Sequence, residues 1–347
     1  MKLYCKKIER LVLVLIVVLG LFATSAKGKG DYNIPKISGK LVYHSYSSYE
    51  EKDSKLYLFN FDNNENICLS DKFDNIYNAM NANFSKDGSK IVFMGMEKDR
   101  DEDKWDIYTY NLQSGCLENL TENNDLRNED PKFSPDGEKV IFKQGHWDED
   151  EDDMVYDLKE LDLKSKKVKS ITKDLDEDSM PFYSEDGKTI YYARGIGENS
   201  KIYKVGRYNV KDVKKIYSSK GVMCYYPIVY GNNLYFTRWY SKSNSSDMIM
   251  KMDLKTKEVT KLKFNNKNYN CSDPCPISEE YMIISSTKGD NGYDLYFADI
   301  NTGETWPLSK LNSKINDERE QLGASCFIES VELKYIITKE KTGEKQI

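Results

Sequence analysis

The sequence predicts an all-β fold, a six-bladed β-propeller of four-stranded antiparallel blades, and three observations support this prediction. The 347 residues contain 26 tyrosines, and no long apolar stripe with helical period follows residue 30. Tyrosine and β-branched residues favour strands. A turn with an Asp-Gly pair recurs at intervals of 49 and 50 residues. Six units of short strands follow one another along the chain, which is the repeat pattern of a propeller.

The first 26 residues differ from the rest and have the layout of a secretory signal segment. Basic residues precede an apolar run over 11–23, and small residues follow it. The run has 13 residues, whereas a membrane-spanning helix needs about 20. We therefore predict a signal peptide over 1–26, a short linker over 27–35 and the propeller over 36–347, with an uncleaved membrane anchor as the alternative. This organisation predicts a secreted protein or one in the extracytoplasmic cell envelope.

The charge of the chain argues against nucleic acid as a partner. Cleavage after Ala26 removes four basic residues and one acidic residue, which takes the formal net charge from -6 to -9. An acidic protein repels the phosphate backbone on average. We expect a membrane contact only if the N-terminal segment is not cleaved.

The clearest repeat is a hairpin built around an Asp-Gly turn. Phe133-Ser134-Pro135-Asp136-Gly137 is preceded by Phe84-Ser85-Lys86-Asp87-Gly88 and followed by Tyr183-Ser184-Glu185-Asp186-Gly187. Glycine adopts positive φ without steric cost, so these turns join the innermost strand of each blade to the second. The motif is therefore predicted to have a structural role. Less similar copies of the repeat follow at Pro227 and Pro274.

The ends of the chain are expected to close the ring. Residues 40–45 resemble a second strand that has no first strand before it, and Ser325–Ile328 resembles a first strand. The C-terminal strand is therefore predicted to complete the first blade. A further strand-like stretch, Leu333–Ile337, has no assigned place.

These repeats make the chain similar to the TolB-like six-bladed β-propeller superfamily, whose WD40-like (PD40) unit has a Phe-Ser-Pro-Asp-Gly core. The resemblance spans about residues 36–340. The superfamily includes protein-binding modules of the cell envelope, propellers fused to serine peptidases, and carbohydrate-active lyases, so the fold does not decide the function. The repeats leave no room for a hydrolase domain, and the sequence has no Gly-x-Ser-x-Gly motif.

Laying the six units over one another brings polar residues into rings at the mouth of the central channel. The sequence places them in the segments that link the blades, and propellers gather ligand contacts at such a mouth. Arg194 and Arg238 are equivalent in adjacent blades, and arginine suits bidentate contacts with carboxylates. Trp105 and Trp147 belong to the same class of loop as Trp239. The candidate ligand-binding residues are Asn128, Glu129, Asp130, Asp178, Asp273, Arg194, Arg238 and Trp239.

No metal or catalytic centre emerges from the sequence. The two histidines, His44 and His146, have no partner at metal-ligand spacing. Asp99, Asp101 and Asp103 alternate as in a calcium loop, but lysine stands at 104 where such a loop needs glycine. We therefore expect solvated acidic loops and no cofactor, with Ca²⁺ as the alternative.

The cysteines leave three alternatives open. After cleavage six remain, and an oxidising exterior permits disulfide bonds among them. Cys224 and Cys271 are equivalent in adjacent blades, and Cys271 and Cys275 are a competing pair. Buried free thiols are the third alternative.

The leading hypothesis is a non-catalytic, monomeric propeller that binds an envelope protein, a peptide or a cell-wall saccharide through its long-loop face, the face where the second and third strands of each blade connect. The alternative is a carbohydrate-active lyase or hydrolase. In that enzyme Arg194 and Arg238 would hold a carboxylate, and Asp178 or Asp130 would act as the base. A membrane-tethered sensor domain is a third possibility if the N-terminal segment stays uncleaved.

Overall fold

The computed structural model describes residues 35–100, 104–122, 126–148, 152–173, 176–195, 197–240, 247–289 and 292–332. Within these ranges no helix is long and apolar enough to span a membrane. The predicted signal segment and the strand-like stretch 333–337 lie outside them.

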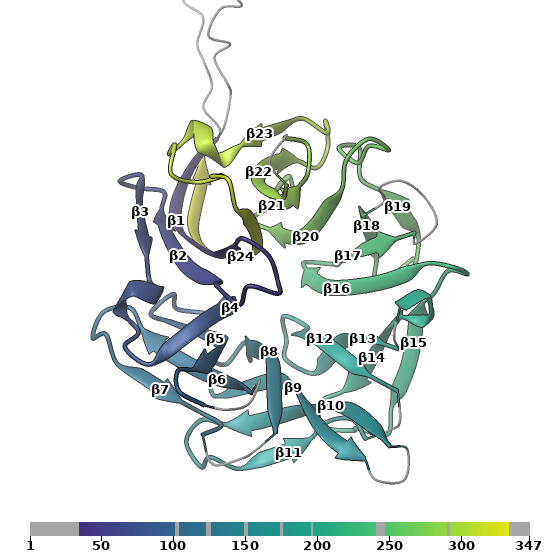
Figure 1. Cartoon of the computed structure of the whole chain (residues 1–347). Coiled ribbons are helices and arrows are strands. Elements are labelled where there is room, and N and C mark those ends of the chain that lie inside the picture. The colour runs from purple at the N-terminus through teal and green to yellow at the C-terminus, as the bar shows by residue number, and fades with distance from the viewer. Residues whose placement is uncertain are drawn as a thin grey trace, which may run out of the picture. The chain divides into compact units, whose positions relative to one another are not determined.

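Six four-stranded antiparallel sheets surround a central axis, which confirms the predicted six-bladed propeller (Figure 1). Blade 1 contains β24 (Glu320–Glu332), β1 (Lys36–Tyr46), β2 (Lys55–Asn60) and β3 (Glu65–Cys68). Blade 2 contains β4 (Ile76–Phe84), β5 (Lys90–Glu97), β6 (Trp105–Asn111) and β7 (Leu117–Asn119). Blade 3 contains β8 (Arg127–Phe133), β9 (Lys139–Asp148), β10 (Asp153–Asp162) and β11 (Val168–Ser170).

The other three blades follow the same order from the axis outwards. Blade 4 contains β12 (Asp178–Tyr183), β13 (Thr189–Arg194), β14 (Lys201–Gly206) and β15 (Val213–Tyr217). Blade 5 contains β16 (Met223–Tyr230), β17 (Asn233–Trp239), β18 (Met248–Asp253) and β19 (Val259–Lys261). Blade 6 contains β20 (Cys271–Pro276), β21 (Tyr281–Ser286), β22 (Asp294–Asp299) and β23 (Thr305–Pro307). Single 3₁₀ turns lie at η1 (Ser70–Lys72), η2 (Gly197–Asn199) and η3 (Leu308–Lys310).

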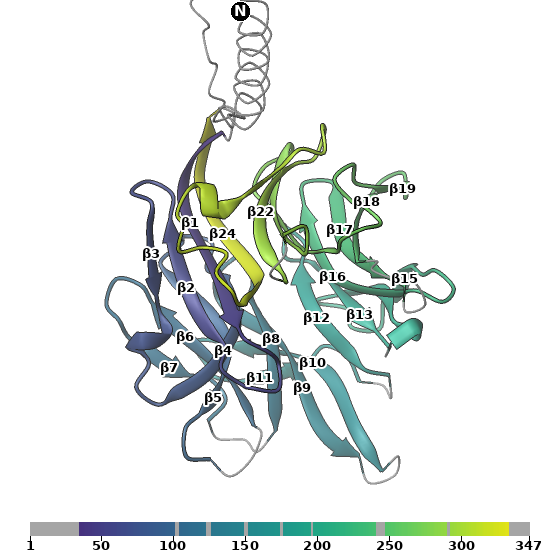
Figure 2. The same ribbon diagram turned by 45° about the horizontal axis from the view of Figure 1, so that its top comes forward.

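The ring closes through a strand from the far end of the chain. β24 pairs with β1 along both strands, so the last described strand is the inner strand of the first blade. Figure 2 shows these two long strands side by side. Each blade packs its faces on its neighbours, and the apolar clusters combine residues of adjacent blades, for example Leu56 of blade 1 with Phe93 of blade 2. A single blade has no such second face, which is why the repeats fold as a ring.

The Asp-Gly turns are scaffold, as the sequence predicts. Gly88, Gly137 and Gly187 have φ values of 66°, 72° and 67°. In the second turn the Ser134 hydroxyl donates to Asp136 Oδ1 at 2.5 Å, and the backbone N–H of Glu138 donates to the same oxygen at 3.0 Å. These donors hold the pKa of the Asp136 carboxyl below its usual value, although partial burial opposes them. We refer to the side of the ring that carries these turns as the Asp-Gly face.

Candidate functional site

Every inner strand contains a bulge at the same place, and the bulged residues form a ring around the channel. The register of each inner strand with its neighbour shifts there, as between Glu129 and Lys132 or between Ser272 and Cys275. A bulge of this kind re-aims side chains and is common beside binding sites. The ring consists of Asn81, Asp130, Met180, Tyr226, Asp273 and Gly323, with φ values of 55°, 54°, 52°, 54°, 52° and 63°.

Five of these six residues adopt a conformation that only glycine adopts without strain. Asparagine and aspartate tolerate it best, whereas Met180 and Tyr226 are conformational outliers. Outliers of this kind persist only where the surrounding structure enforces them, and they cluster at functional sites. The strained residues of the bulges therefore indicate a candidate ligand site at the channel wall.

Side chains of the ring contact each other across the channel. Asn81 donates through Nδ2 to Asp130 Oδ1 at 2.7 Å and accepts from the Tyr226 hydroxyl at 3.3 Å. On the other side, the Gly323 N–H donates to Asp273 Oδ2 at 2.9 Å. Burial raises the pKa of both Asp130 and Asp273, because a carboxylate loses its hydration there. These contacts join blades 1, 2, 3, 5 and 6 at one level of the channel.

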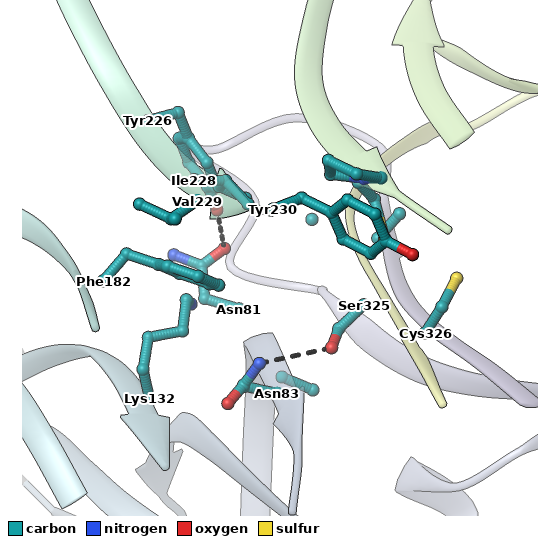
Figure 3. Close-up of a pocket in the computed structure, with 15 residues that line it drawn as sticks. Asn81, Asn83, Lys132, Phe182, Tyr226, Ile228, Val229, Tyr230, Ser325 and Cys326 are labelled. Carbon is teal, nitrogen blue, oxygen red and sulfur yellow. Dashed lines mark hydrogen bonds between the residues drawn. The ribbon is translucent and has the colours of Figure 1, made fainter. Parts of the chain in front are cut away.

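A cavity of about 130 Å³ adjoins this ring on the side of the Asp-Gly face. Its wall combines polar and aromatic groups, and Figure 3 shows them converging from several blades. Asn83 donates through Nδ2 to Ser325 Oγ at 3.3 Å and accepts from the Phe133 N–H at 3.0 Å, which fixes one side of the wall. The labelled lining residues are Asn81, Asn83, Lys132, Phe182, Tyr226, Ile228, Val229, Tyr230, Ser325 and Cys326.

The cavity continues into an open groove. The groove shares Asn83, Tyr230 and Ser325 with the cavity and also contacts Ser85 and Lys86 of the first Asp-Gly turn. Since Phe84 ends β4 immediately before that turn, the groove opens on the Asp-Gly face. A ligand can reach the cavity from this face.

Lys132 places an ammonium group in the wall of the cavity. It is half-buried on β8 and reaches up between Asn81 and Phe182 (Figure 3). Burial lowers its pKa, while the charges of Asp130 and Asp273 oppose that shift. Among the described residues no hydrogen bond to the Lys132 ammonium occurs. The group therefore has donors to offer a ligand.

The acidic residues predicted at the channel mouth lie inside the inner strands, so their placement in linking segments was wrong. β8 begins at Arg127 and β12 at Asp178, because each inner strand stays paired with the second strand on the N-terminal side of its bulge. Asn128 is fully buried and accepts from Gln144 Nε2 at 2.9 Å. Glu129 accepts from Arg127 at 2.5 Å and lies 3.0 Å from the Lys143 ammonium.

Asp178 and Arg194 form a bidentate ion pair with each other. They stand opposite in the β12–β13 register, and Arg194 Nε and Nη2 donate to the two carboxylate oxygens at 2.7 and 2.8 Å. Asp178 is fully buried. The guanidinium also lies 5.0 Å from the centre of the Tyr203 ring. The pair is therefore an internal link of blade 4.

The remaining predicted residues lie apart from the cavity. Arg238 lies 4.7 Å from the Tyr240 ring centre, and its buried Nε atom has no hydrogen-bond partner among the described residues. Trp239 is half-buried at the end of β17. Trp147 is 56% exposed, whereas Trp105 is 2% exposed, so its assignment to an exposed loop was wrong: it packs in the apolar core of blades 2 and 3.

His44 is a structural residue of the channel wall. It is 4% exposed, stacks on Tyr46, and its Nδ1 accepts from the Asn81 N–H at 3.4 Å. Burial, helped by the Lys132 charge, lowers its pKa to about 3, so it is neutral at pH 7. His146 is half-buried on β9.

The candidate calcium loop lies largely outside the described part of the chain. Asp101 and Asp103 are among the residues not described, and Asp99 is exposed. In the ranges that the structure describes, no three His, Cys, Asp or Glu side chains are grouped to hold a metal.

Lys132, Asn83 and Ser325 were not predicted as site residues from the sequence. A lysine, an asparagine and a serine among many others carry no distinctive signal by type. Their signal is positional: Asn83 and Lys132 stand two residues after the ring positions 81 and 130, and Ser325 stands two after 323. Extending the alignment of the blades by two residues along the strand would have found the set.

Fold and channel together define a β-propeller with a polar, ligand-sized cavity on its axis. The chain belongs to the TolB β-propeller domain family (PD40), whose model matches residues 80–319. This match confirms the resemblance inferred from the repeats. No protein among the curated sequences matches the chain.

Solved structures with similar folds differ in function. TolB of Acinetobacter baumannii is 18% identical, with a TM-score of 0.63, over 84% of this chain and 67% of that one. Hydrazine synthase of Kuenenia stuttgartiensis is 13% identical, with a TM-score of 0.66, over 87% and 48%. A prolyl endopeptidase is 12% identical, with a TM-score of 0.52, over 79% and 49%. At these identities the likeness extends to the fold alone.

Proposed function

We propose that the protein is an exported, non-catalytic binding propeller that receives a segment of an envelope protein or peptide in the central cavity. The observation that carries this proposal is the Lys132 ammonium, which faces the cavity without a hydrogen bond to any described residue. A buried ammonium is stabilised when it donates to a carbonyl or carboxylate oxygen. The ligand therefore carries such an acceptor on the part that enters.

The shape of the site favours an extended ligand. The cavity of about 130 Å³ holds one side chain or a chain end, and the groove past Ser85 and Lys86 offers a path for the residues that follow. Phe182, Tyr226 and Tyr230 add apolar and aromatic surface to the same wall. A few polar groups set in an apolar wall are typical of specific ligand sites. A cell-wall saccharide is the other ligand class that fits, because aromatic faces and amide groups also hold sugars.

The alternative of a carbohydrate lyase or hydrolase receives no support from the site. That mechanism assigns a substrate carboxylate to Arg194 and Arg238, and the role of base to Asp178 or Asp130. Arg194 and Asp178 hold each other at 2.7 and 2.8 Å, so both are occupied within blade 4. Asp130 accepts a hydrogen bond from Asn81 at 2.7 Å, and Arg238 lies apart from the cavity on β17. We therefore retain binding as the function.

Site-specific photocrosslinking tests the proposal and distinguishes the two faces. Benzoylphenylalanine is introduced at Lys86 in the groove, at Trp147 near the end of β9 on the long-loop face, or at exposed Lys188 as a control. After irradiation with extracts of the cell envelope or with wall fragments, we expect a discrete product at Lys86 alone. A product at Trp147 alone would instead support the long-loop face predicted from the sequence, and no product at either would contradict the binding role.

A further inference from the structure

Two cysteines line the central cavity where the propeller ring closes. Cys275 lies on β20 of blade 6, and Cys326 lies on β24, the inner strand of blade 1. Both line the central cavity, on inner strands that contact each other, and the neighbouring Cys275 is among the groups that raise the pKa of Cys326. We propose that Cys275 and Cys326 form a disulfide bond that fastens blade 6 to blade 1. This inference concerns the ring itself and does not depend on the identity of the ligand.

The pairings suggested by the sequence do not fit the structure as well. Cys224 packs in the apolar cluster between blades 4 and 5, and Cys271 packs in that between blades 5 and 6, where it contacts Ser286 Oγ at 3.6 Å. Cys271 and Cys275 lie four residues apart on one strand, about 13 Å at 3.3 Å per residue. A disulfide needs Cα atoms within about 7 Å. The contact between blades 6 and 1 is therefore the better site.

The surroundings allow an oxidant to reach this pair. Cys326 is half-buried and lines both the cavity and the open groove, so a disulfide reagent in solvent can enter from the Asp-Gly face. Lys132 and Cys275 line the same cavity. The thiolate is the form of a cysteine that attacks sulfur.

The reaction is a thiol–disulfide exchange in two steps. The Cys326 thiol loses its proton to water and attacks one sulfur of a small-molecule disulfide, which releases one thiolate and leaves a mixed disulfide. The Cys275 thiolate then attacks the Cys326 sulfur and displaces the second thiolate of the reagent. The two cysteines are oxidised, and the reagent is reduced to two thiols. Because burial raises the pKa of Cys326, the first step is slow at neutral pH and accelerates as the pH rises.

The disulfide bond would link blade 6 to β24, the strand by which the C-terminal part of the chain closes the ring. It would enclose residues 275–326, which include all of β21, β22 and β23 and therefore most of blade 6. Cross-linking a loop of this length restricts the unfolded chain and stabilises the folded one. Export to an oxidising compartment, as the N-terminal segment predicts, would supply the conditions for it.

Oxidation of the exported chain tests the proposal directly. The folded protein is incubated with oxidised glutathione at pH 7 and pH 9, alkylated, digested and analysed by mass spectrometry. We expect a linked peptide containing Cys275 and Cys326, formed faster at pH 9, and a melting temperature about 5 °C above that of the reduced protein. The C326S variant should lose both effects, and C116S, which alters an exposed cysteine, should keep them.

The mass-spectrometric analysis of the wild-type protein tests the disulfide bond even if a variant fails to fold. Alkylation of both Cys275 and Cys326 in the oxidised, folded protein would overturn the proposal. So would a linked peptide that joins either one to another cysteine. A link that forms only after denaturation would show that the folded geometry does not bring the two sulfurs together, with the same consequence.

Discussion

Arg194 holds both oxygens of Asp178, with Nε and Nη2 at 2.7 and 2.8 Å from the carboxylate. Arg194 was predicted to bind the carboxylate of a ligand, but in the structure it binds a carboxylate of its own blade. The side chains are 12% and 0% exposed, so the pair is desolvated as well as bidentate. Arg194 and Asp178 are therefore engaged with each other. Lys132 in the cavity wall, by contrast, has no hydrogen-bond partner for its ammonium among the described residues.

Removing the guanidinium should destabilise the fold. In Arg194→Met the buried Asp178 loses its counter-charge, and we expect the free energy of unfolding to fall by about 3 kcal/mol, measured by urea denaturation. The matched control is Lys166→Met, which breaks an exposed ion pair with Glu118 and should cost about 0.5 kcal/mol or less. Equal losses in the two variants would show that the Asp178 pair is not structural.

Gly323 is required in the bulge ring for two reasons, and a second glycine separates them. Gly323 has a φ of 63°, and a Cβ built on it would lie 2.4 Å from the His44 ring. Gly137 has a φ of 72°, but no atom lies within 4 Å of its Cβ position. We expect Gly137→Ala to cost about 1 kcal/mol from backbone strain, and Gly323→Ala to cost about 2 kcal/mol more from overpacking. Similar unfolding midpoints for both variants would contradict this account of the channel wall.

His44 should make the protein sensitive to mild acid. Its pKa is about 3 in the folded chain and 6.5 in the reference state, so the unfolded chain takes up the proton first as the pH falls. The stabilising contribution is complete above pH 6.5 and is lost between pH 6.5 and 3. Between pH 7.5 and 4.5 we expect the wild type to lose about 3 kcal/mol more than His44→Gln does. His146→Gln serves as the control and should lose as much stability as the wild type over this pH interval. An equal loss in His44→Gln would show that His44 does not cause the acid sensitivity.

Arg207 joins two blades and should be essential to their packing. It is 2% exposed and contacts Glu160 at 2.6 Å, Asp136 at 3.3 Å and the Gly187 carbonyl at 3.3 Å. Arg207→Ala leaves Glu160 buried without its counter-charge, and we expect a loss of about 3 kcal/mol in urea denaturation. Arg207→Lys should recover only part of the loss, because lysine cannot make these contacts at once. Full recovery by lysine would show that charge alone matters.

The fold could be predicted from the sequence because its signals are local. The Asp-Gly turns need glycine at positive φ, so Gly88, Gly137 and Gly187 recur at the repeat interval whatever the ligand is. The closure of the ring followed from counting strands at the two ends. Strand boundaries could not be derived in the same way, because β8 and β20 stay paired with the next strand on both sides of the bulges at Asp130 and Asp273.

The site could be predicted only in part, because it depends on contacts between strands. Asp178 and Arg194 looked like separate ligand groups in the sequence, and only the strand register shows that they face each other. Lys132 looked like an ordinary lysine, and only the closed ring places it in the cavity. The alignment of the blades placed Asp130 and Asp273 near the channel, but it could not show which side chains hydrogen-bond to one another.

The most direct test of the binding account is the crosslink at Lys86 in a Lys132→Met background. If the ammonium receives the ligand, the yield of the Lys86 product from envelope extracts or wall fragments should fall about tenfold, since a charge-assisted hydrogen bond is lost. The yield should remain unchanged in a Lys188→Met background, with circular dichroism showing the same fold in both. An undiminished yield in Lys132→Met would contradict the claim that the central cavity binds the ligand.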